Sequence, residues 1–276
     1  MLFYKYKNDL KTNREYFKCL KKAEYIHKRI KKLFDNLPTV YYLKSGIKGE
    51  SYIKNAQKHA HNNYFFLLDI RNFFPSITKK YIKKELMNTY KQSSNVAEFI
   101  SNALTAPQKK FDDKRALITG SPISQYFSYV INKRMFEELN VLAQKQGITF
   151  TVYVDDISFS ANFPIGHAFL KKVFYVIKSN GFELSKNKKD KKKFYRGKIG
   201  NNSIVTGILI QENGLFISKQ REKKIEGNIT ILKSMSIQDK VFEKLYLSTK
   251  SSIHQAVLVN EKYKSYLNQI EKIKTL

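Results

Sequence analysis

Three aspartates follow or interrupt strongly apolar segments and could together bind hard metal ions. Asp69 comes near the end of the apolar and aromatic run YFFLLDI at 64–70, and Asp155 and Asp156 form a pair inside TFTVYVDDISFSA at 149–161. Carboxylates held close together repel one another unless cations join them. Two Mg²⁺ ions about 3.5 to 4 Å apart need such a set to activate a hydroxyl and neutralise a leaving pyrophosphate. The pattern therefore indicates a nucleotidyl-transfer site, although an acidic pair at a hairpin tip can also be a solvated turn.

The sequence offers little for other common chemistries. The single cysteine, Cys19, allows no intramolecular disulfide and no cysteine zinc cluster, and it is expected to be an ordinary thiol. There is no GxxxxGKS/T phosphate loop, and the five histidines lack zinc-protease spacing, so they are expected at the surface or in the core.

The charge balance predicts a polyanionic partner. Lys and Arg total 51 against 23 Asp and Glu, which gives a formal net charge of +28, and a nucleic acid would neutralise it. A lysine-rich composition bias and membrane-surface binding are the alternatives. The basic residues concentrate at 1–34, 183–198 and 219–276, so we expect a less charged body flanked by positive surfaces.

Nothing in the sequence predicts insertion into a membrane. The N-terminal residues carry charges every few positions, unlike a signal peptide, and no apolar run approaches the roughly 20 residues that span a bilayer. There are no repeats or Pro/Gly/Ser-rich linkers. We expect one compact, cytoplasmic protein with no membrane partner.

The elements that must position the aspartates are a buried strand and a hairpin. A continuous apolar run such as 64–70 is typical of a central strand buried on both faces, so Asp69 is expected at a strand end. The alternation across 149–161 predicts a β-hairpin with Asp155 and Asp156 at its turn. A second hairpin is expected over 203–218, with its turn near Asn213 and Gly214.

Helices are expected on either side of these strands. A basic amphipathic helix is predicted near 25–34, a helix over 121–142 starting at Ser121 with Pro122 first, and another over 165–180. The chain from Lys219 onward is helical by pattern. The apolar residues expected on shared faces are Tyr25, Ile26, Ile30, Leu33 and Phe34 in the first helix and Ile225, Ile229 and Leu232 in the last region. The mixture of elements predicts an α+β fold.

Six segments in this order resemble reverse transcriptases. LLDIRNFFPSI at 67–77 is similar to their first catalytic motif, YVDDISFS at 153–160 to their Tyr-x-Asp-Asp motif, and TGSPISQYFSYVIN at 119–132 and GFELSKNKK at 181–189 to the motifs before and after the palm helix. Two segments resemble retron enzymes in particular. They are Asn-Ala-x-x-His at Asn55, Ala56 and His59, and Val-Thr-Gly at Val205, Thr206 and Gly207.

The resemblance implies a right-hand polymerase with an antiparallel palm sheet. The N-terminal basic region, 1–62, would form fingers, with an insert near 78–115. The palm would occupy 63–215, and 216–276 would form a small RNA-binding thumb. It further implies that Asp69 and Asp155 ligate two Mg²⁺ ions, that Asp156 completes the acidic cluster, and that the Ile70 carbonyl adds a ligand.

The resemblance also implies nucleotide and RNA contacts. Phe74 would block a ribose 2′-OH and so favour dNTPs, although it could equally be a core aromatic. The other implied dNTP contacts are the backbone amides of Asn72 and Phe73, Gly120, Lys188 near the pyrophosphate (or merely solvated), and, as a finger residue, Arg14. The implied RNA-binding residues are Asn55, His59, Val205, Thr206 and Gly207. The family pattern is not followed at Thr119, Gln125 and Val154, where Gln, Pro and Ala are usual, so the detailed dNTP contacts stay open.

Resemblance to retron enzymes implies a biological setting. The template and primer would be a dedicated structured noncoding RNA, primed from a guanosine 2′-OH to give a branched RNA-linked DNA (msDNA) in bacterial phage defence. A separate effector protein would act beside it, and a host RNase H would remove the template, since the last 60 residues leave no room for such a domain. The alternatives are another defence-associated or group-II-like reverse transcriptase and a catalytically idle RNA-binding protein.

Overall fold

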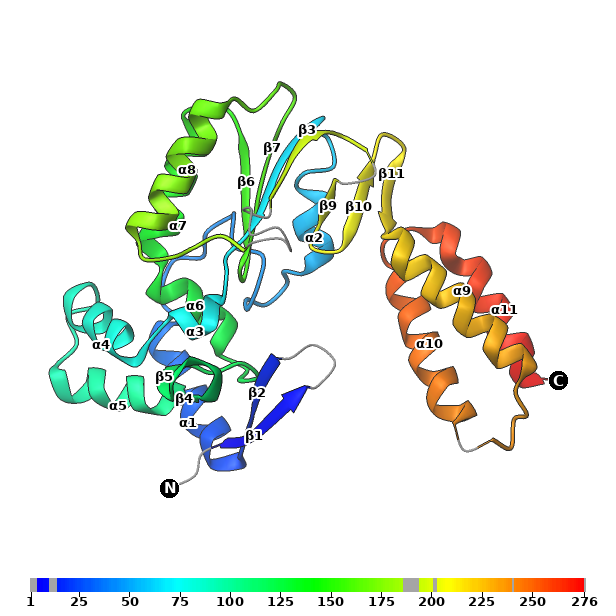
Figure 1. Cartoon of the computed structure of the whole chain (residues 1–276), viewed down its shortest axis with the longest axis horizontal. Helices are drawn as coiled ribbons and strands as arrows, with labels where there is room; N and C mark the ends of the chain where they lie inside the picture. Colours follow the sequence, from blue (N-terminus) through cyan, green and yellow to red (C-terminus); the bar gives the residue numbers. More distant parts are fainter. Residues whose placement is uncertain (1–3, 10–13, 186–193, 201–202, 240, 276) are drawn as a thin grey trace.

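The computed structural model describes residues 4–9, 14–185, 194–200, 203–239 and 241–275 (Figure 1). Its centre is a four-stranded sheet in the order β6-β7-β3-β8, in which every neighbouring pair is antiparallel. The strands are β3 (Tyr64–Asp69), β6 (Thr149–Tyr153), β7 (Asp156–Ala161) and β8 (Phe194–Lys198). The α+β class and the antiparallel sheet predicted from the sequence are confirmed.

The central strand β3 is covered on both faces, as its apolar run predicts. Phe66 is fully buried and its ring lies 5.9 Å from that of Phe174 in α8 (His167–Ser179). Phe65, which points to the opposite face, packs in a second cluster with Ala56 of α2 (Tyr52–Gln57) and Ile208. Figure 1 shows α8 on one side of the sheet and α2 on the other. Asp69 therefore lies where β3 emerges from the core, at the end of a strand that is packed on both faces.

The helix predicted over 121–142 is two helices, α6 (Ser124–Ile131) and α7 (Lys133–Gln144). The break is at Asn132, whose side chain donates to the Ser128 carbonyl (2.8 Å) and accepts from the Tyr81 hydroxyl (3.0 Å). The start at Ser121 is also wrong, because Ser121 and Pro122 lie in a turn before the helix. The Ser121 hydroxyl lies 2.6 Å from His27 Nδ1, and the Ser121 carbonyl accepts a hydrogen bond from the Ser124 N–H.

The N-terminal region surrounds helix α1 (Lys21–Phe34). The predicted amphipathic helix is present, but its buried face differs from the prediction: Tyr25 and Leu33 are 61% and 64% exposed, and His27 is buried. Burial of His27 is tolerated because its ring nitrogens meet Ser121 and the Ala103 carbonyl. The other elements here are β1 (Tyr4–Asp9), β2 (Arg14–Cys19), α3 (Phe73–Ser76), α4 (Lys79–Asn88), α5 (Ser94–Leu104), β4 (Thr105–Gln108), η1 (Lys109–Phe111) and β5 (Lys114–Leu117).

The C-terminal region begins with a small sheet and continues as a helical bundle. Strands β9 (Ile204–Val205), β10 (Ile208–Gln211) and β11 (Gly214–Ile217) include the predicted hairpin. The helices are α9 (Lys219–Ser234), α10 (Phe242–Val257) and α11 (Lys264–Thr275), with η2 (Glu261–Tyr263) before the last. As predicted, Ile225, Ile229 and Leu232 are buried together, in a core separate from that of the central sheet. The bundle stands apart beyond β11 (Figure 1).

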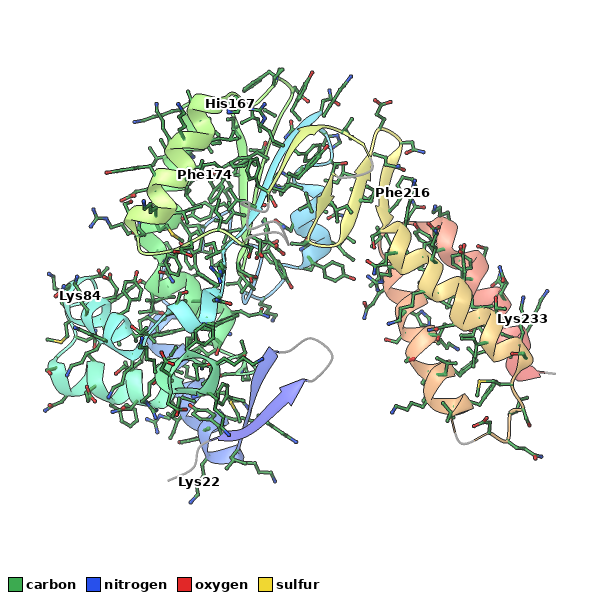
Figure 2. All side chains as sticks on the ribbon, in the orientation of Figure 1. Lys22, Lys84, His167, Phe174, Phe216 and Lys233 are labelled. Carbon is green, nitrogen blue, oxygen red and sulfur yellow. The ribbon has the colours of Figure 1, made fainter. Side chains whose placement is uncertain are left out.

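Lysines project from elements that lie far apart in the molecule (Figure 2). Lys22 on α1, Lys84 on α4 and Lys233 on α9 point outward from three distant elements (Figure 2). Among the residues that the structure describes, no helix is long and apolar enough to cross a membrane.

Candidate active site

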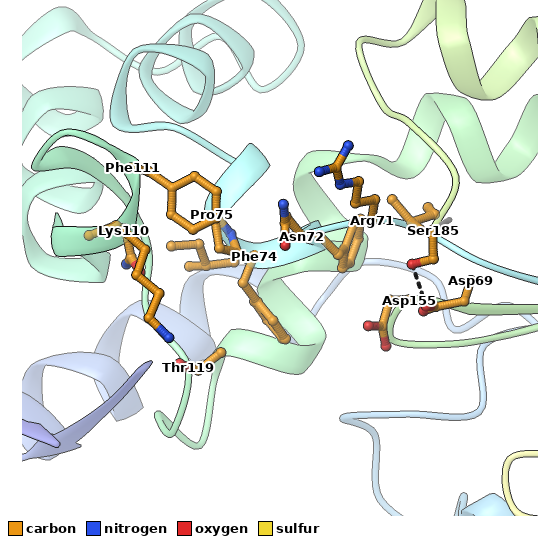
Figure 3. Close-up of a pocket in the computed structure, with 14 residues that line it drawn as sticks. Asp69, Arg71, Asn72, Phe74, Pro75, Lys110, Phe111, Thr119, Asp155 and Ser185 are labelled. Carbon is orange, nitrogen blue, oxygen red and sulfur yellow. Dashed lines mark hydrogen bonds between the residues drawn. The ribbon is translucent and has the colours of Figure 1, made fainter. Parts of the chain in front are cut away.

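The structure brings the three aspartates to one end of the central sheet. Asp69, the last residue of β3, is the cross-strand partner of Asp156, the first residue of β7, and paired residues on adjacent strands have Cα atoms about 4.5 to 5.5 Å apart. Asp155 lies in the two-residue turn that joins β6 to β7, because Tyr153 pairs with Asp156. All three aspartate residues are half-buried. Figure 3 shows Asp69 and Asp155 side by side.

Asp69 is held by a residue that the sequence did not single out. The Ser185 hydroxyl donates to Asp69 Oδ2 at 2.6 Å, and the Ser185 N–H donates to the Asp69 carbonyl at 2.9 Å. Arg71 N–H in turn donates to the Glu183 carbonyl at 2.8 Å. Residues 183–185 therefore run as a short edge beside β3 and fix both the backbone and the carboxylate of Asp69. The only sequence signal for Ser185 is its place in the segment FELS that follows Gly181.

The backbone of Ile70 joins β3 to the acidic turn. Its N–H donates to the Asp155 carbonyl at 3.1 Å. In a regular strand the N–H and C=O of one residue point to the same side, which predicts that the Ile70 carbonyl is directed toward Asp155. The Ile70 side chain is buried in the core. The role of this carbonyl as a metal ligand remains a prediction.

A cavity of about 370 Å³ opens on one side of Asp69 and Asp155, a size suited to a small-molecule ligand. Phe74 forms part of its wall and is half-buried, whereas its neighbour Phe73 is buried against Phe136 and Phe182. Both aromatics therefore line the cavity and also contact the central core, Phe73 as a buried member and Phe74 from its edge. Asn72, which also lines the cavity, has a left-handed backbone with φ 48°.

The far wall of this cavity comes from the β4–β5 hairpin, and the sequence prediction missed it. Gln108, Lys110 and Phe111 line the cavity together with Thr119. In Figure 3, Lys110 and Phe111 lie across the cavity from Asp155. These residues fall inside the insert predicted near 78–115, and the adjacent lysines of QKKF were the available signal.

The structure gives less direct support for the remaining predicted dNTP contacts. Gly120 has φ 96°, and a Cβ there would lie 3.1 Å from the Phe17 carbonyl, so its close backbone neighbour is strand β2. The Phe17 N–H donates to the carbonyl of Thr119. Arg14 begins that same strand. Lys188 lies outside the described residues. Nucleotide contact by these residues therefore stays a prediction.

A second, more open cavity of about 590 Å³ lies on the other side of the acidic residues. Asp69 and Asp155 line both cavities, and Asp156 lines only this one. The opposite wall includes Tyr195 of β8 and Thr206. The acidic turn therefore forms the boundary between two cavities.

The segments at 55–59 and 205–207 meet in space. The Asn55 side-chain amide donates to Thr206 Oγ1 at 3.4 Å, and the Thr206 hydroxyl donates to the Tyr52 carbonyl at 2.9 Å. Thr206 and Gly207 form the tight turn between β9 and β10, with φ of 47° and 81°. Positive φ is costly for a β-branched residue, so the contacts with α2 hold Thr206 in an unfavourable conformation.

Asn55, His59 and Val205 are buried inside the protein. His59 lies 2.6 Å from Ser160 Oγ and 2.7 Å from Thr151 Oγ1, and burial lowers its pKa to about 3. These three side chains therefore make contacts within the protein and are not exposed to a ligand. The prediction of direct RNA contact stays open only for the half-buried Thr206 and the exposed Gly207.

The acidic residues do not form a ready-made metal cluster. Within the described ranges, no three His, Cys, Asp or Glu side chains are gathered closely enough to hold a metal ion. In this structure the partner of Asp69 Oδ2 is the Ser185 hydroxyl, and metal binding by the three aspartates stays a prediction. The donor set itself, carboxylate oxygens beside open cavities, is the type that divalent hard cations prefer.

Comparisons with known proteins identify relatives of the chain. The Salmonella heidelberg (strain 579083-10) Retron Se72 reverse transcriptase is 24% identical over 234 residues, which cover 83% of this chain and 60% of the relative. The Escherichia coli Retron Ec86 reverse transcriptase is 25% identical over 236 residues, covering 82% and 66%. The chain thus spans 60% and 66% of the length of these two relatives.

Among solved structures, the chain is similar to one titled as telomerase from Candida albicans in complex with a fragment of telomeric RNA. The TM-score is 0.41 and the identity 10%, over 91% of this chain and 55% of the other. The family model described as reverse transcriptase (RNA-dependent DNA polymerase) matches residues 7–201. Because this match spans well over half of the chain and includes all three aspartates, the chain belongs to the reverse transcriptase (RNA-dependent DNA polymerase) family.

Proposed function

We propose that the chain is an RNA-directed DNA polymerase whose active site is formed by Asp69, Asp155 and Asp156. The observation that carries this proposal is the cross-strand pairing of Asp69 with Asp156, with Asp155 in the adjoining turn, at the boundary of two cavities. A polymerase needs a nucleotide on one side of its acidic residues and a primer end on the other. Family membership and the charge of +28 support a nucleic-acid substrate.

The three carboxylates would hold two divalent cations, with the Ile70 carbonyl as a further oxygen ligand. When bound, Mg²⁺ would lower the pKa of the attacking 3′- or 2′-hydroxyl and neutralise charge on the leaving pyrophosphate. The contribution of the chain is to hold the oxygens in place. Ser185 fixes one Asp69 oxygen by its 2.6 Å hydrogen bond, and the Ile70 N–H fixes the Asp155 backbone.

The smaller cavity, lined by Asn72, Phe74 and Lys110, would bind the incoming dNTP. Phe74 would meet the sugar and exclude a 2′-OH, because its ring already forms the wall beside the acidic residues. The ammonium group of Lys110 would attract the triphosphate. Amides of Asn72 and Phe73, Gly120, Lys188 and Arg14 are the further proposed contacts.

The same proposal assigns the parts of a right hand. The region 1–62 and the insert near 78–115 would be fingers, since the insert carries the far wall of the nucleotide cavity. The palm would be 63–215, which holds the acidic residues. The bundle at 216–276 would be a thumb on RNA, a role favoured by its separate core and its net positive charge.

We further propose that the enzyme is of the retron type. It would copy a dedicated structured noncoding RNA into branched msDNA in phage defence, with a separate effector protein and a host RNase H. The names of the relatives support this, as does the contact between the two retron-like segments through Asn55 and Thr206. Another defence-associated or group-II-like reverse transcriptase remains the alternative.

The polymerase proposal is tested by template choice. Purified protein, Mg²⁺ and dNTPs are supplied with the same primer on an RNA or a DNA template, and product length is measured. We expect extension on RNA, absent for Asp69→Asn and reduced several-fold for Ser185→Ala. Tight RNA binding without extension by the wild type under any divalent metal would favour the catalytically idle RNA-binding protein instead.

The retron proposal needs the protein from cells that carry its native flanking DNA. After RNase digestion of the copurified nucleic acid, we expect a discrete small DNA attached through a 2′ branch, absent from an Asp155→Asn, Asp156→Asn double variant. DNA synthesis without a branched product would favour the other reverse transcriptases.

A further inference from the structure

The acidic turn has an unfavourable backbone at one position. The two residues that join β6 to β7 are Val154 and Asp155. Val154 has φ 59°, and Asp155 is not among the residues with positive φ. A positive φ at the first central position alone is the pattern of a type II′ turn, in which glycine usually takes that position. A β-branched residue there is strained and persists only if its surroundings hold it.

Ser45 supplies the contact that holds this position. Its Oγ accepts a hydrogen bond from the Val154 N–H at 2.9 Å, across 109 residues of sequence. The Ser45 side chain is buried, with 2% exposure. A serine hydroxyl is a strong acceptor for a backbone N–H, and the change of serine to alanine removes that hydroxyl and leaves the N–H without its partner.

The segment that carries Ser45 is itself fixed against β6. Leu43 forms a parallel bridge with Val152, and backbone hydrogen bonds at 2.9 Å run from Lys44 N–H to the Val152 carbonyl and from Val152 N–H to the Tyr42 carbonyl. Residues 42–45 therefore extend the central sheet beyond β6 for a short distance, and Ser45 lies beside the turn between β6 and β7.

Two further contacts fix the same segment. Lys44, which is buried, forms an ion pair with Glu50 Oε1 at 2.9 Å. Gly46 has φ 71°, and a Cβ there would lie 2.6 Å from the backbone nitrogen of Tyr126 in α6. Any side chain at 46 would push the segment away from α6. The backbone at Ser45 is thus defined by sheet pairing, an ion pair and a close helix approach.

We propose that Ser45 is a positioning residue for the acidic site. By holding Val154 in its left-handed conformation, Ser45 sets the direction in which Asp155 and Asp156 leave the turn, and so their distance from Asp69. The turn is then held on two sides, at Val154 by Ser45 and at Asp155 by the Ile70 N–H. This inference rests on the proposed function for its catalytic meaning, but the contact itself can be tested without catalysis.

The catalytic test uses Ser45→Ala with Ser51→Ala as the matched control. Ser51 lies in the same region and its Oγ also accepts a backbone N–H, from Lys54 at 3.2 Å, but it caps α2 instead of the turn. We expect Ser45→Ala to lose about tenfold in the rate of dNTP incorporation. The Mg²⁺ concentration for half-maximal rate should rise severalfold and RNA affinity should stay unchanged. Ser51→Ala should keep the wild-type Mg²⁺ requirement.

Rescue separates positioning from general folding. Glycine adopts positive φ without strain, so Val154→Gly should make the turn independent of Ser45. In the Val154→Gly background, Ser45→Ala should therefore change the rate and the Mg²⁺ requirement less than twofold. An undiminished loss in that background, or a Ser45→Ala variant with wild-type rate and Mg²⁺ requirement, would overturn the proposal.

A readout without substrate separates this inference from the polymerase proposal. Hydrogen exchange is measured by mass spectrometry on the peptide covering 150–158 in the free protein. Ser45→Ala should exchange faster in this peptide than the wild type, whereas Ser51→Ala should not. Faster exchange in a protein that makes no DNA would support the Ser45 contact and reject the polymerase; unchanged exchange would reject the contact whatever the activity.

Discussion

His59 makes the stability of the central sheet depend on pH. The residue is fully buried between α2 and the sheet, and its two ring nitrogens lie 2.6 Å from Ser160 Oγ and 2.7 Å from Thr151 Oγ1. One nitrogen donates and the other accepts, so the neutral ring is satisfied. Burial disfavours the imidazolium and lowers the pKa of His59 to about 3.

The sign and size follow from proton linkage. In the unfolded chain the His59 pKa returns to its ordinary value of about 6.5, so below that pH the unfolded state binds a proton that the folded state does not. The contribution of His59 to the free energy of unfolding is therefore fully present above pH 6.5 and is lost as the pH drops from 6.5 toward 3. The slope is about 1.4 kcal/mol per pH unit, which gives a loss of about 2 kcal/mol at pH 5. The lowered pKa of the buried His27 acts in the same direction.

A comparison of variants isolates the contribution of His59. Urea unfolding of the wild type and His59→Gln is measured from pH 7.5 to 5.0, so that His27 contributes equally to both. The wild type should be more stable at pH 7.5, and the difference in unfolding free energy should narrow by about 2 kcal/mol at pH 5.0. Removal of the exposed His254 by His254→Gln is the control. If the curves of unfolding free energy against pH were parallel for the wild type and His59→Gln, His59 would take up its proton in the folded protein, and the reasoning would be refuted.

Other predictions concern the nucleotide cavity and the β9–β10 turn. Phe74→Val should open the cavity wall and raise incorporation of rNTPs relative to dNTPs by about tenfold or more, measured by competition on one primed RNA; an unchanged ratio would leave Phe74 a core aromatic. Lys110→Gln should raise KM for dNTP severalfold with little change in kcat, and an effect on RNA affinity alone would place Lys110 elsewhere. Thr206→Gly should lower the free energy of unfolding by more in the wild type than in the Asn55→Ala variant, because glycine removes the acceptor of the buried Asn55 amide. The difference, measured as the coupling in a double-mutant cycle, should be about 1 kcal/mol. Additive effects would mean that the 3.4 Å contact is unimportant.

The parts of the site that lie on one local pattern could be predicted from the sequence. The apolar run ending near Asp69 and the alternation around Asp155 and Asp156 predict a buried strand and a hairpin, and both are present. Their pairing follows because β3 and β7 lie side by side in antiparallel register, which brings Asp69 opposite Asp156. Short-range periodicity therefore predicts the elements that carry these residues, whereas the β3–β7 pairing that brings Asp69 opposite Asp156 joins segments far apart in the sequence.

The rest depends on contacts between residues distant in sequence. The helix break at Asn132 is accompanied by a hydrogen bond from Tyr81, and burial of His27 depends on Ser121 and the Ala103 carbonyl. None of these partners is near in the chain, so the helix pattern alone predicts one long helix and does not decide whether His27 lies at the surface or in the core. For the same reason, nothing in YVDD alone predicts that Ser45 meets Val154.

The most direct test of the central claim is a comparison of the wild type with Asp155→Asn in primer extension on RNA, at protein concentrations where both bind the template equally. Asparagine keeps the size of the side chain and removes its charge, so the turn and the RNA affinity should persist while the metal ions lose a ligand. The account predicts a loss of at least about 100-fold in incorporation rate. Equal rates for the two proteins would contradict it and would mean that the chemistry occurs without Asp155.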